Sequence, residues 1–250
     1  MNLLADDEPP PFSVERPTAA SPFILLCEHA GNRLPRKLGD LGLEADELTR
    51  HIAWDIGAAA VAEGLSARLD ATLITQTYSR LAIDCNRLPE AHDAIPLISE
   101  ATDIPGNRDL SADEIEARLR DIHRPYQACI AEHLDARETS ILVDIHSFTP
   151  VFKGVARPWH MGLLYGADQR RLADILFDLI AEDGGVTVGD NQPYAVDFRN
   201  DYTIPIHGVG RGIDNIEIEI RQDLITSEAG QVEWAGRLGG WLTAALKHLP

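Results

Sequence analysis

The chain has 250 residues, of which 44% are apolar and 25% charged, so it is long enough to bury one large hydrophobic core. Its 22 Lys and Arg residues against 40 Asp and Glu residues give a net charge of −18, which repels polyphosphate and excludes nucleic acid as an expected partner. No run of about 18 apolar residues occurs, and prolines and acidic residues occupy the N-terminus where a signal peptide would be basic and then apolar, so we expect a cytoplasmic protein without membrane association.

The first part of the chain predicts an arm, a buried strand and a long helix. Residues 1–20 are rich in Pro, Asp and Glu and show little periodicity, which predicts a loosely ordered N-terminal arm before a single domain over residues 21–250. From Pro22, the apolar run FILLCEH is followed by glycine and proline, a pattern typical of a strand buried on both faces. Apolar residues at helical spacing on an alanine-rich background predict a long helix over 44–69.

The middle of the chain predicts another strand and another long helix. Residues 71–77 are rich in residues that favour strands, and 80–87 continue as an extended or turning segment. Residues 111–137 have the apolar periodicity of an amphipathic helix. Ser111 is followed three residues later by Glu114, so we expect a capping box at the start of this helix.

The remaining sequence alternates strands with helices. In chain order it predicts a strand over SILVDIHSF, a strand near 160–165, a helix over 169–182, a strand over NIEIEIR and a closing helix over 228–248. Such alternation indicates an α/β fold with a largely parallel sheet covered by helices on both sides. Binding sites in such folds form at the carboxyl ends of the strands.

Three predicted strands end in charged or imidazole side chains, which cost free energy to bury unless they are paired or bind a ligand. Because the carboxyl ends of parallel strands meet at one edge of the sheet, we expect these groups to converge. Side chains alternate along a strand, so the two glutamates and the arginine of NIEIEIR share one face. Two imidazoles with carboxylates and no cysteine pair suit zinc in an open catalytic site, and manganese, iron or cobalt accept the same ligand types. The residues concerned are Glu28, His29, Asp144, His146, Glu217, Glu219 and Arg221.

Each of these residues also has a structural interpretation. A single histidine at a strand end is often a hydrogen-bonded structural residue, so His29 and His146 indicate a site only as a pair. Asp144 either orients His146 or caps a turn. Glu217 fits a solvated face of an edge strand as well as it fits a site, which leaves Glu219 the stronger candidate.

Two further groups of polar residues allow alternative interpretations. His51 and Asp55 are four residues apart in the predicted helix, so they share a face and approach a metal together, or they form a cap or a surface pair. The segment SRLAIDCNR forms an ion-pair network between strands, or its guanidinium groups hold a carboxylate of a substrate. The polar residues of this segment are Arg80, Asp84, Asn86 and Arg87.

Cysteine usage excludes two further classes of protein. Cys27, Cys85 and Cys129 are odd in number, widely spaced and contain no CxxC pair. A disulfide framework and a cysteine-rich zinc site are therefore not expected. We interpret all three residues as reduced, structural thiols.

Several short segments together resemble the N-formylglutamate amidohydrolase family from about Pro22 to Leu224. Each is short, but their order and spacing are specific to the family. The resemblance implies a phosphorylase/hydrolase-like three-layer α/β fold with a mixed, mostly parallel central sheet, related to zinc exopeptidases and succinylglutamate desuccinylase. It also implies hydrolysis of an N-acyl amide of glutamate. The segments are CEHAGNRLP, AWDIGA, SRLAIDCNR, IPGNRDLS, HRPYQ, VDIHSF, NQPY and IEIRQDL.

The same resemblance implies which residues bind the metal. His29 and His146 become the metal ligands, and the expected ion is zinc. Related zinc carboxypeptidase-like sites have a glutamate three residues after the first histidine, where this chain has Asn32. The carboxylate ligand must then come from elsewhere, with Asp55 as the first choice and Glu28 as the second.

The resemblance also implies a reaction. Glu219 stands where related enzymes keep the general base that accepts a proton from the attacking water, and Arg221 beside it stabilises the oxyanion. Arg80 and Arg87, with Asn86, become anchors for the substrate carboxylate. We expect hydrolysis of N-formyl-L-glutamate, or a similar small N-acyl amino acid, to formate and glutamate. The alternatives are a related deacylase or peptidase, and a non-catalytic protein that binds small anions.

Overall fold

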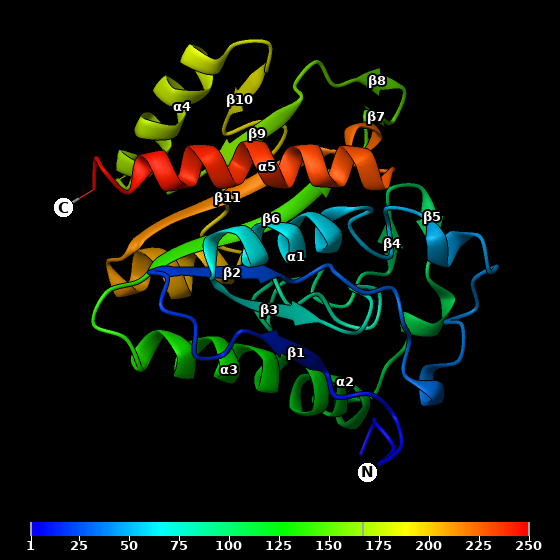
Figure 1. Ribbon diagram of the computed structural model, residues 1–250. Coiled ribbons are helices and arrows are strands. Elements are labelled where there is room, and N and C mark those ends of the chain that lie inside the picture. The colour runs from blue at the N-terminus through cyan, green and yellow to red at the C-terminus, as the bar shows by residue number, and fades with distance from the viewer. Residues whose placement is uncertain (1, 167, 250) are drawn as a thin grey trace.

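The computed structural model describes residues 2–166 and 168–249, and a mixed sheet forms its centre (Figure 1). The seven strands of this sheet are β1 (Phe12–Glu15), β2 (Phe23–Cys27), β3 (Thr72–Gln76), β6 (Ile141–Phe148), β9 (Met161–Leu164), β10 (Val188–Asp190) and β11 (Asp214–Arg221). Their order is β1-β3-β2-β6-β11-β9-β10. The four pairs β3–β2, β2–β6, β6–β11 and β9–β10 are parallel, whereas β1–β3 and β11–β9 are antiparallel. The expected mostly parallel, mixed sheet is confirmed.

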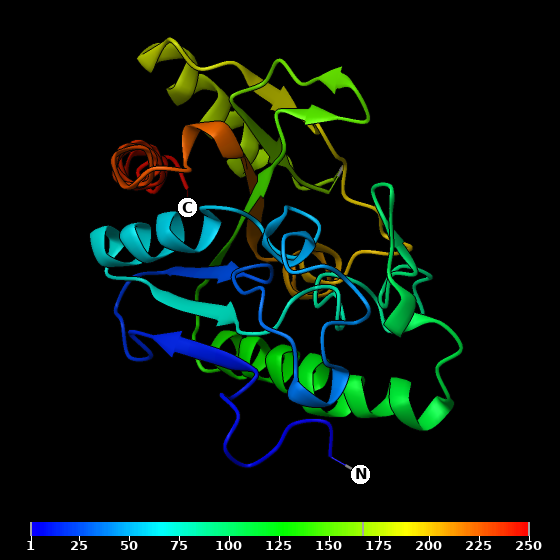
Figure 2. The same cartoon turned by 90° about the vertical axis from the view of Figure 1, so that its right-hand side faces the viewer.

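Helices cover both faces of the sheet (Figure 2). On one face, α1 (Ala58–Leu69), α4 (Arg171–Asp183) and α5 (Glu228–Ala245) bury their apolar sides in the larger hydrophobic cluster. On the other face, α2 (Ala112–Arg118) and α3 (Arg124–Asp135) belong to one helical run, and α3 packs in a second cluster with β2, β3 and β6. This arrangement is the three-layer α/β architecture that the sequence predicted.

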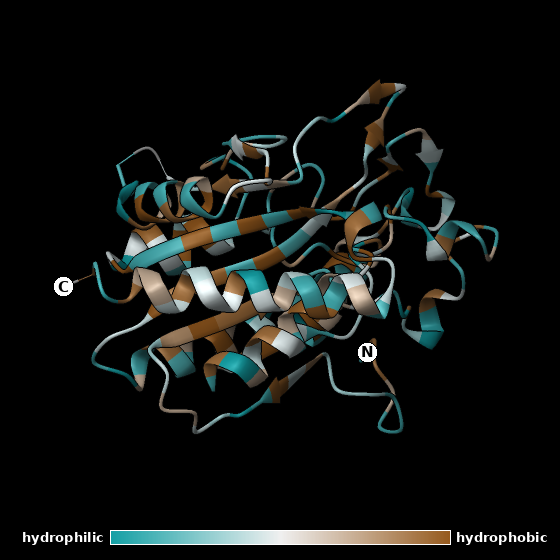
Figure 3. Cartoon of the chain, turned by 45° about the horizontal axis from the view of Figure 1, so that its top comes forward, coloured by the Kyte–Doolittle hydropathy of each residue, from teal (hydrophilic) through white to brown (hydrophobic). Residues whose placement is uncertain are grey.

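The two faces of strand β11 differ, since one enters the hydrophobic core and the other carries acidic side chains. Hydrophilic and hydrophobic residues alternate along it (Figure 3). Ile216, Ile218 and Ile220 are fully buried in the larger cluster, so alternation directs Glu217 and Glu219 to the opposite face. Because β11 lies between β6 and β9, it is an inner strand, and Glu217 is only 7% exposed. The solvated edge strand that would explain Glu217 structurally does not exist.

The helix expected over 111–137 forms with a local distortion. Its capping box is present, since the Ser111 hydroxyl accepts the backbone N–H of Glu114 and the Glu114 carboxylate accepts that of Ser111. A π-helical segment, Leu119–His123, joins α2 to α3. Pro125 follows it, and because proline has no N–H to donate, the regular bonding of an α-helix is interrupted there.

The long helix predicted over 44–69 is wrong in its first half. Only α1 is helical, and the preceding residues form turns with one 3₁₀ turn at Glu47–Thr49. Gly57 has φ of +82° at the start of α1, and a Cβ there would lie 2.3 Å from the carbonyl oxygen of Ile225. The chain therefore turns sharply at a position that only glycine tolerates. Of the apolar residues that suggested a helix before α1, Leu48 packs against a small separate cluster of Leu41, Leu43, Ala53, Leu81 and Ile104.

The loosely ordered arm predicted over residues 1–20 is also wrong for the residues described. Strand β1 pairs with β3 and extends the sheet at its edge. Phe12 and Val14 pack against the second core cluster, and Leu3 is only 6% exposed. The alternating segment FSVE thus obtains its stability from the sheet edge rather than from local periodicity.

Short elements complete the fold. Two hairpins, β4 (Ile98–Ser99) with β5 (Thr102–Asp103) and β7 (Val151–Phe152) with β8 (Val155–Ala156), lie toward the carboxyl ends of β2 and β6 (Figure 1). A second π-helical segment is Thr203–Gly208. The other 3₁₀ turns are Arg36–Leu38, Pro105–Asn107, Val209–Arg211 and Gln222–Leu224.

Two expectations about the whole chain can be compared with the structure. The cysteines Cys27, Cys85 and Cys129 are all free and buried, as expected. Within residues 2–166 and 168–249, no helix combines the length and the apolar character needed to cross a bilayer.

Candidate metal centre

The parallel strands β2 and β6 bring His29 and His146 together at their carboxyl ends. His29 is the second residue after the end of β2, and His146 lies near the end of β6. The two rings meet edge to face with centroids 4.8 Å apart, and their Nδ1 atoms are 3.1 Å apart. Both side chains are buried, each residue being 2% exposed. The structure thus forms the pair of strand-end histidines that the sequence predicted.

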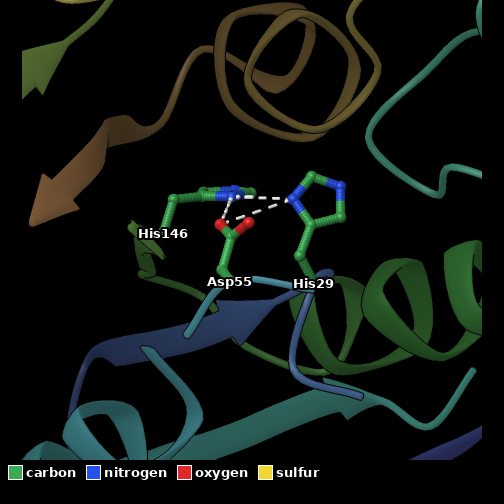
Figure 4. A group of neighbouring side chains, drawn as sticks. All are labelled: His29, Asp55 and His146. Carbon is green, nitrogen blue, oxygen red and sulfur yellow. Dashed lines mark hydrogen bonds and ion pairs between the residues drawn. The ribbon is translucent and has the colours of Figure 1, made fainter. Parts of the chain in front are cut away.

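Asp55 joins the histidines from the loop before α1 (Figure 4). Its Oδ2 atom lies 2.9 Å from Nδ1 of His146 and 3.5 Å from Nδ1 of His29. The backbone N–H of Ser147 donates to the same oxygen, and the backbone N–H of Asp55 donates to the carbonyl of His29. These bonds fix the loop against both strands. Asp55, rather than Glu28, is therefore the carboxylate that faces both Nδ1 atoms.

Other carboxylates hold each imidazole from its opposite side. Nε2 of His29 lies 2.8 Å from an oxygen of Asp84. Nε2 of His146 lies 3.0 Å from Asp144 and 3.5 Å from Glu28. A carboxylate that accepts the Nε2 proton fixes the tautomer and leaves the Nδ1 lone pair available for a metal. The sequence placed Asp84 only in a polar segment and gave no signal for its contact with His29.

The charges around His146 show that this position requires a cation. Burial opposes a charged ring, but Asp144, Asp55 and Glu28 outweigh it and raise the pKa of His146 well above its ordinary value. A divalent metal ion held by Nδ1 of His146 and by Asp55 would meet the same demand for positive charge.

The donor atoms of His29, Asp55 and His146 fit a divalent metal. The distances between them, from 2.9 to 3.5 Å, are close to the roughly 3.3 Å that separates ligand atoms in tetrahedral zinc sites with bonds of about 2.0–2.1 Å. Two imidazoles and one carboxylate without cysteine form the ligand set of catalytic zinc sites, which keep a fourth position open. The geometry favours these three residues as the metal ligands.

Glu28 and Asp144 form a buried acidic pair beneath His146. They are 1% and 0% exposed, and Glu28 accepts a hydrogen bond from the hydroxyl of Thr203 at 2.6 Å. Burial and the negative charge of Glu28 raise the pKa of Asp144 well above its usual range. With His146 they form a second group of potential ligands, but they face the Nε2 side of the ring, so we assign them to its support.

Glu219 faces the centre from the neighbouring strand. In the register of β11 and β6, Glu219 pairs with His146 and Glu217 pairs with Asp144. Glu219 is 5% exposed, and its Oε2 atom has no hydrogen-bond partner in the described part of the chain. Burial raises the pKa of this carboxyl to about 8, and the negative charges of Asp55 and Glu217 add to that effect. Glu219 is thus a buried acid that titrates near neutrality.

We expect the metal-free Glu219→Gln variant to be more stable than the wild type at alkaline pH. The pKa of Glu219 is about 8 in the folded protein against an ordinary 4.5, so the folded state holds the proton more tightly and wild-type stability falls as pH rises between these values. Glutamine never ionises, and each pH unit of this interval corresponds to about 1.4 kcal/mol. Melting temperatures of the two chelator-treated proteins should be close near pH 5 and diverge toward pH 8. Parallel curves would contradict this pKa.

A cavity of about 520 Å³ opens over these groups. Pockets of a few hundred Å³ suit small ligands. The cavity is lined by the three proposed ligands and by residues from distant segments, including Glu219, His51, Arg80, Arg87 and Tyr194. A small organic molecule in this cavity would lie directly against the candidate metal centre.

Arg80 lines the cavity and belongs to the centre itself. Its guanidinium donates to Asp84 at 2.6 Å, lies 3.6 Å from Asp55 and approaches Nδ1 of His29 at 3.2 Å. The negative charge of Asp84, together with that of Asp55, more than offsets burial and raises the pKa of Arg80. Arg80 is thus a permanent positive charge beside the candidate ligands.

Arg87 and Asn86 are held by structural contacts. Arg87 donates to Asp93 at 3.0 Å and to Asp201 at 2.7 Å. The Asn86 side chain accepts the backbone N–H of Thr203. The ion-pair network, one of the two interpretations of this segment, is therefore present. Both residues also line the cavity, so a role in substrate binding stays a prediction.

Two predicted features of the site do not form. Arg221 is not among the described residues that line the cavity, because β11 ends there and its guanidinium turns to Asp223 at 2.7 Å. The helical face shared by His51 and Asp55 does not exist, since both residues lie in turns. His51 instead lies 3.4 Å from Glu100 at the cavity wall. Asn32 donates to the carbonyl of Leu48 and holds a loop.

Known proteins resemble this chain over nearly its whole length. A family model described as N-formylglutamate amidohydrolase matches residues 21–226. The solved structure of the gene product Atu2144 from Agrobacterium tumefaciens has a TM-score of 0.93 and 40% identity over 99% of each chain. The N-formylglutamate amidohydrolase from Ralstonia eutropha JMP134 shares the fold with a TM-score of 0.71 and 22% identity, over 95% of this chain and 97% of that one. A bacteriophage poly-gamma-glutamate hydrolase shares it more distantly, with a TM-score of 0.50 and 10% identity over 98% and 94% of the two chains. No functionally curated protein matches.

Proposed function

The chain belongs to the N-formylglutamate amidohydrolase family, and from this premise we propose that it hydrolyses the amide bond of N-formyl-L-glutamate or a similar N-acyl amino acid. The products are formate, or the corresponding acid, and the free amino acid. One observation carries the proposal: the buried Glu219, whose Oε2 atom has no hydrogen-bond partner among the described residues, stands beside His29, Asp55 and His146, a group that could hold a metal.

We propose that His29, Asp55 and His146 hold a divalent metal, with zinc as the first choice. An ion bound by such a set polarises an amide carbonyl and lowers the pKa of water. The carboxylates Asp84 and Asp144 orient the two imidazoles from behind.

Glu219 supplies the proton transfers. In its ionised form it accepts a proton from the attacking water as the new C–O bond forms, and it then delivers that proton to the leaving nitrogen as the C–N bond breaks. A pKa raised toward neutrality by burial suits both steps, because a general acid–base works best near its own pKa.

Arg80 is the nearest candidate for stabilising the oxyanion. Attack on the carbonyl places negative charge on its oxygen, and a fixed positive group in the cavity stabilises that charge. Arg80 lies 3.6 Å from Asp55 and lines the cavity. We propose it for the role that the family resemblance implied for Arg221, whose guanidinium turns to Asp223.

The size of the cavity and the state of the cysteines support a small metabolite as substrate and the cytoplasm as location. A volume of about 520 Å³ fits an N-acyl amino acid. Cys27, Cys85 and Cys129 are unpaired, which suits a reducing compartment. We therefore propose a cytoplasmic enzyme.

The proposal predicts a preference for the formyl group. With zinc-, manganese- or cobalt-reconstituted protein, kcat/KM for N-formyl-L-glutamate should exceed that for the acetyl and succinyl analogues by at least about tenfold, because a pocket discriminates by the groups it can pack and pair. Release of formate, acetate or succinate is measured, with the Glu219→Gln protein as the blank.

Two other outcomes point to the alternatives. Preference for the acetyl or succinyl compound would make the protein a related deacylase. Absence of turnover with every metal, together with retained binding of the substrates, would make it a small-anion-binding protein.

A further inference from the structure

A third arginine, Arg157, directly follows the β7–β8 hairpin and packs against aromatic side chains of the cavity wall. The guanidinium carbon of Arg157 lies 4.7 Å from the ring centroid of Phe152, 4.9 Å from that of Tyr194 and 5.6 Å from that of Phe148. These three aromatic residues line the cavity. Cation–π contacts of this kind hold a guanidinium in place while its N–H groups stay available to a ligand.

Arg157 differs from Arg80 and Arg87, which line the cavity, in the charged side chains that surround it. Arg80 lies near Asp84 and Asp55, and Arg87 is bound by Asp93 and Asp201. By contrast, the guanidinium of Arg157 makes no ion pair with any carboxylate in the described part of the chain, and it donates to the backbone carbonyl of Thr149 at 3.3 Å. The chain carries 40 acidic residues, so an arginine left without one beside this cavity indicates that a ligand supplies the anion.

The position of Arg157 suits a carboxylate close to the reacting amide. Phe148 lies two residues beyond His146 on the same face of β6, which separates them by roughly 7 Å along the strand. Tyr194, whose ring contacts Arg157, lines the same cavity as Glu219 and the candidate metal ligands. A substrate bound at the candidate metal centre would therefore extend toward the aromatic side chains that hold this guanidinium.

We propose that Arg157 binds a carboxylate of the substrate's amino-acid half and thereby makes the enzyme select N-acyl amino acids that carry it. The inference rests on the proposed function and adds the residue that determines specificity. A guanidinium matches a carboxylate with two parallel N–H···O bonds, which lysine cannot reproduce. Either the α-carboxylate or the side-chain carboxylate offers this chemistry, and the test separates them.

The test compares Arg157→Gln with a matched control. We expect Arg157→Gln to lower kcat/KM for N-formyl-L-glutamate by roughly 10- to 100-fold, mainly through KM, because a charge-assisted pair is lost on binding. Arg157→Lys should recover part of the loss. Lys153→Gln removes one positive charge from the same hairpin, where Lys153 lies 5.3 Å from the Phe152 ring, and should change kcat/KM by less than about twofold.

Three substrates identify the carboxylate. If Arg157 binds the side-chain carboxylate, Arg157→Gln spares N-formylglutamine and impairs N-formylisoglutamine, whose α-carboxyl is an amide. If it binds the α-carboxylate, the pattern reverses. An equal loss with all three substrates, or no loss with N-formyl-L-glutamate, would overturn the proposal, because a merely structural role does not discriminate between carboxylates.

A binding measurement keeps this inference separate from the proposed function. Calorimetry of N-formyl-L-glutamate with zinc-loaded Glu219→Gln protein, with and without Arg157→Gln, needs no turnover. Weaker binding in the double variant, at an unchanged melting temperature, supports Arg157 as the carboxylate receptor even if the wild type hydrolyses none of the substrates and the proposed function fails. Equal binding by the two proteins overturns the assignment of Arg157.

Discussion

Replacing Glu219 by glutamine should lower kcat by roughly 10²- to 10⁴-fold, the usual contribution of a general acid–base. Glutamine keeps the size of the side chain on β11 but accepts no proton. Oε2 of Glu219 has no partner among the described residues, so the substitution breaks no hydrogen bond of this atom. Because Glu219 is not one of the three proposed ligands, the variant should keep its metal. Initial rates and metal content are measured on the same preparation.

Glu217→Gln is the matched comparison for this variant. Glu217 lies two residues earlier on the same face of β11, and its register partner is Asp144 rather than the proposed ligand His146. We expect a smaller loss of kcat than in Glu219→Gln. A Glu219→Gln protein that keeps more than about a tenth of wild-type turnover would rule out Glu219 as the general base, given the usual size of that contribution.

Replacing His146 by alanine should abolish both metal binding and turnover. His146 contributes one of three converging donor atoms, and its Nδ1 lies 2.9 Å from Asp55 and 3.1 Å from Nδ1 of His29. Two remaining ligands do not complete a catalytic zinc site, which uses three protein ligands and one open position. Metal content after dialysis and the rate of formate release should both fall to background.

Asp84→Asn provides a graded test of the same centre. Asp84 touches His29 only at Nε2, and loss of such an orienting carboxylate typically costs about 10- to 100-fold in metal affinity. Competition with a chelator measures this affinity, and excess zinc should restore activity to Asp84→Asn but not to His146→Ala. His133→Ala, on α3 and outside the cavity, serves as a control. Stoichiometric metal in His146→Ala would refute the assigned ligand set.

The strands that build the site could be predicted because their patterns are local. A run such as FILLC is apolar throughout because β2 is covered on both faces, and NIEIEIR alternates because only one face of β11 enters the core. Two such strands in parallel necessarily bring His29 and His146 to one edge. Periodicity therefore located the two histidines of the candidate centre.

The residues that come from loops could not be predicted in the same way. Asp55 lies just before the turn at Gly57, where the distant carbonyl of Ile225 leaves no room for a side chain. Asp84 faces His29 through a turn that no periodicity encodes. Alternation along β11 predicted the face on which Arg221 lies. Arg221 is the last residue of that strand, however, and its guanidinium binds the nearby Asp223. Each case depends on tertiary contacts rather than on local pattern.

The proposed metal ligands lie apart from the hydrophobic core. His29, Asp55 and His146 lie at strand ends and in a loop, and none of them belongs to the apolar clusters of the described chain. Those clusters join the helices to the sheet without any contribution from an ion. We therefore expect the chain to fold before it binds a metal, unlike a zinc finger. An activity that depends on the proposed metal would then follow the supply of that metal as well as the rate of synthesis.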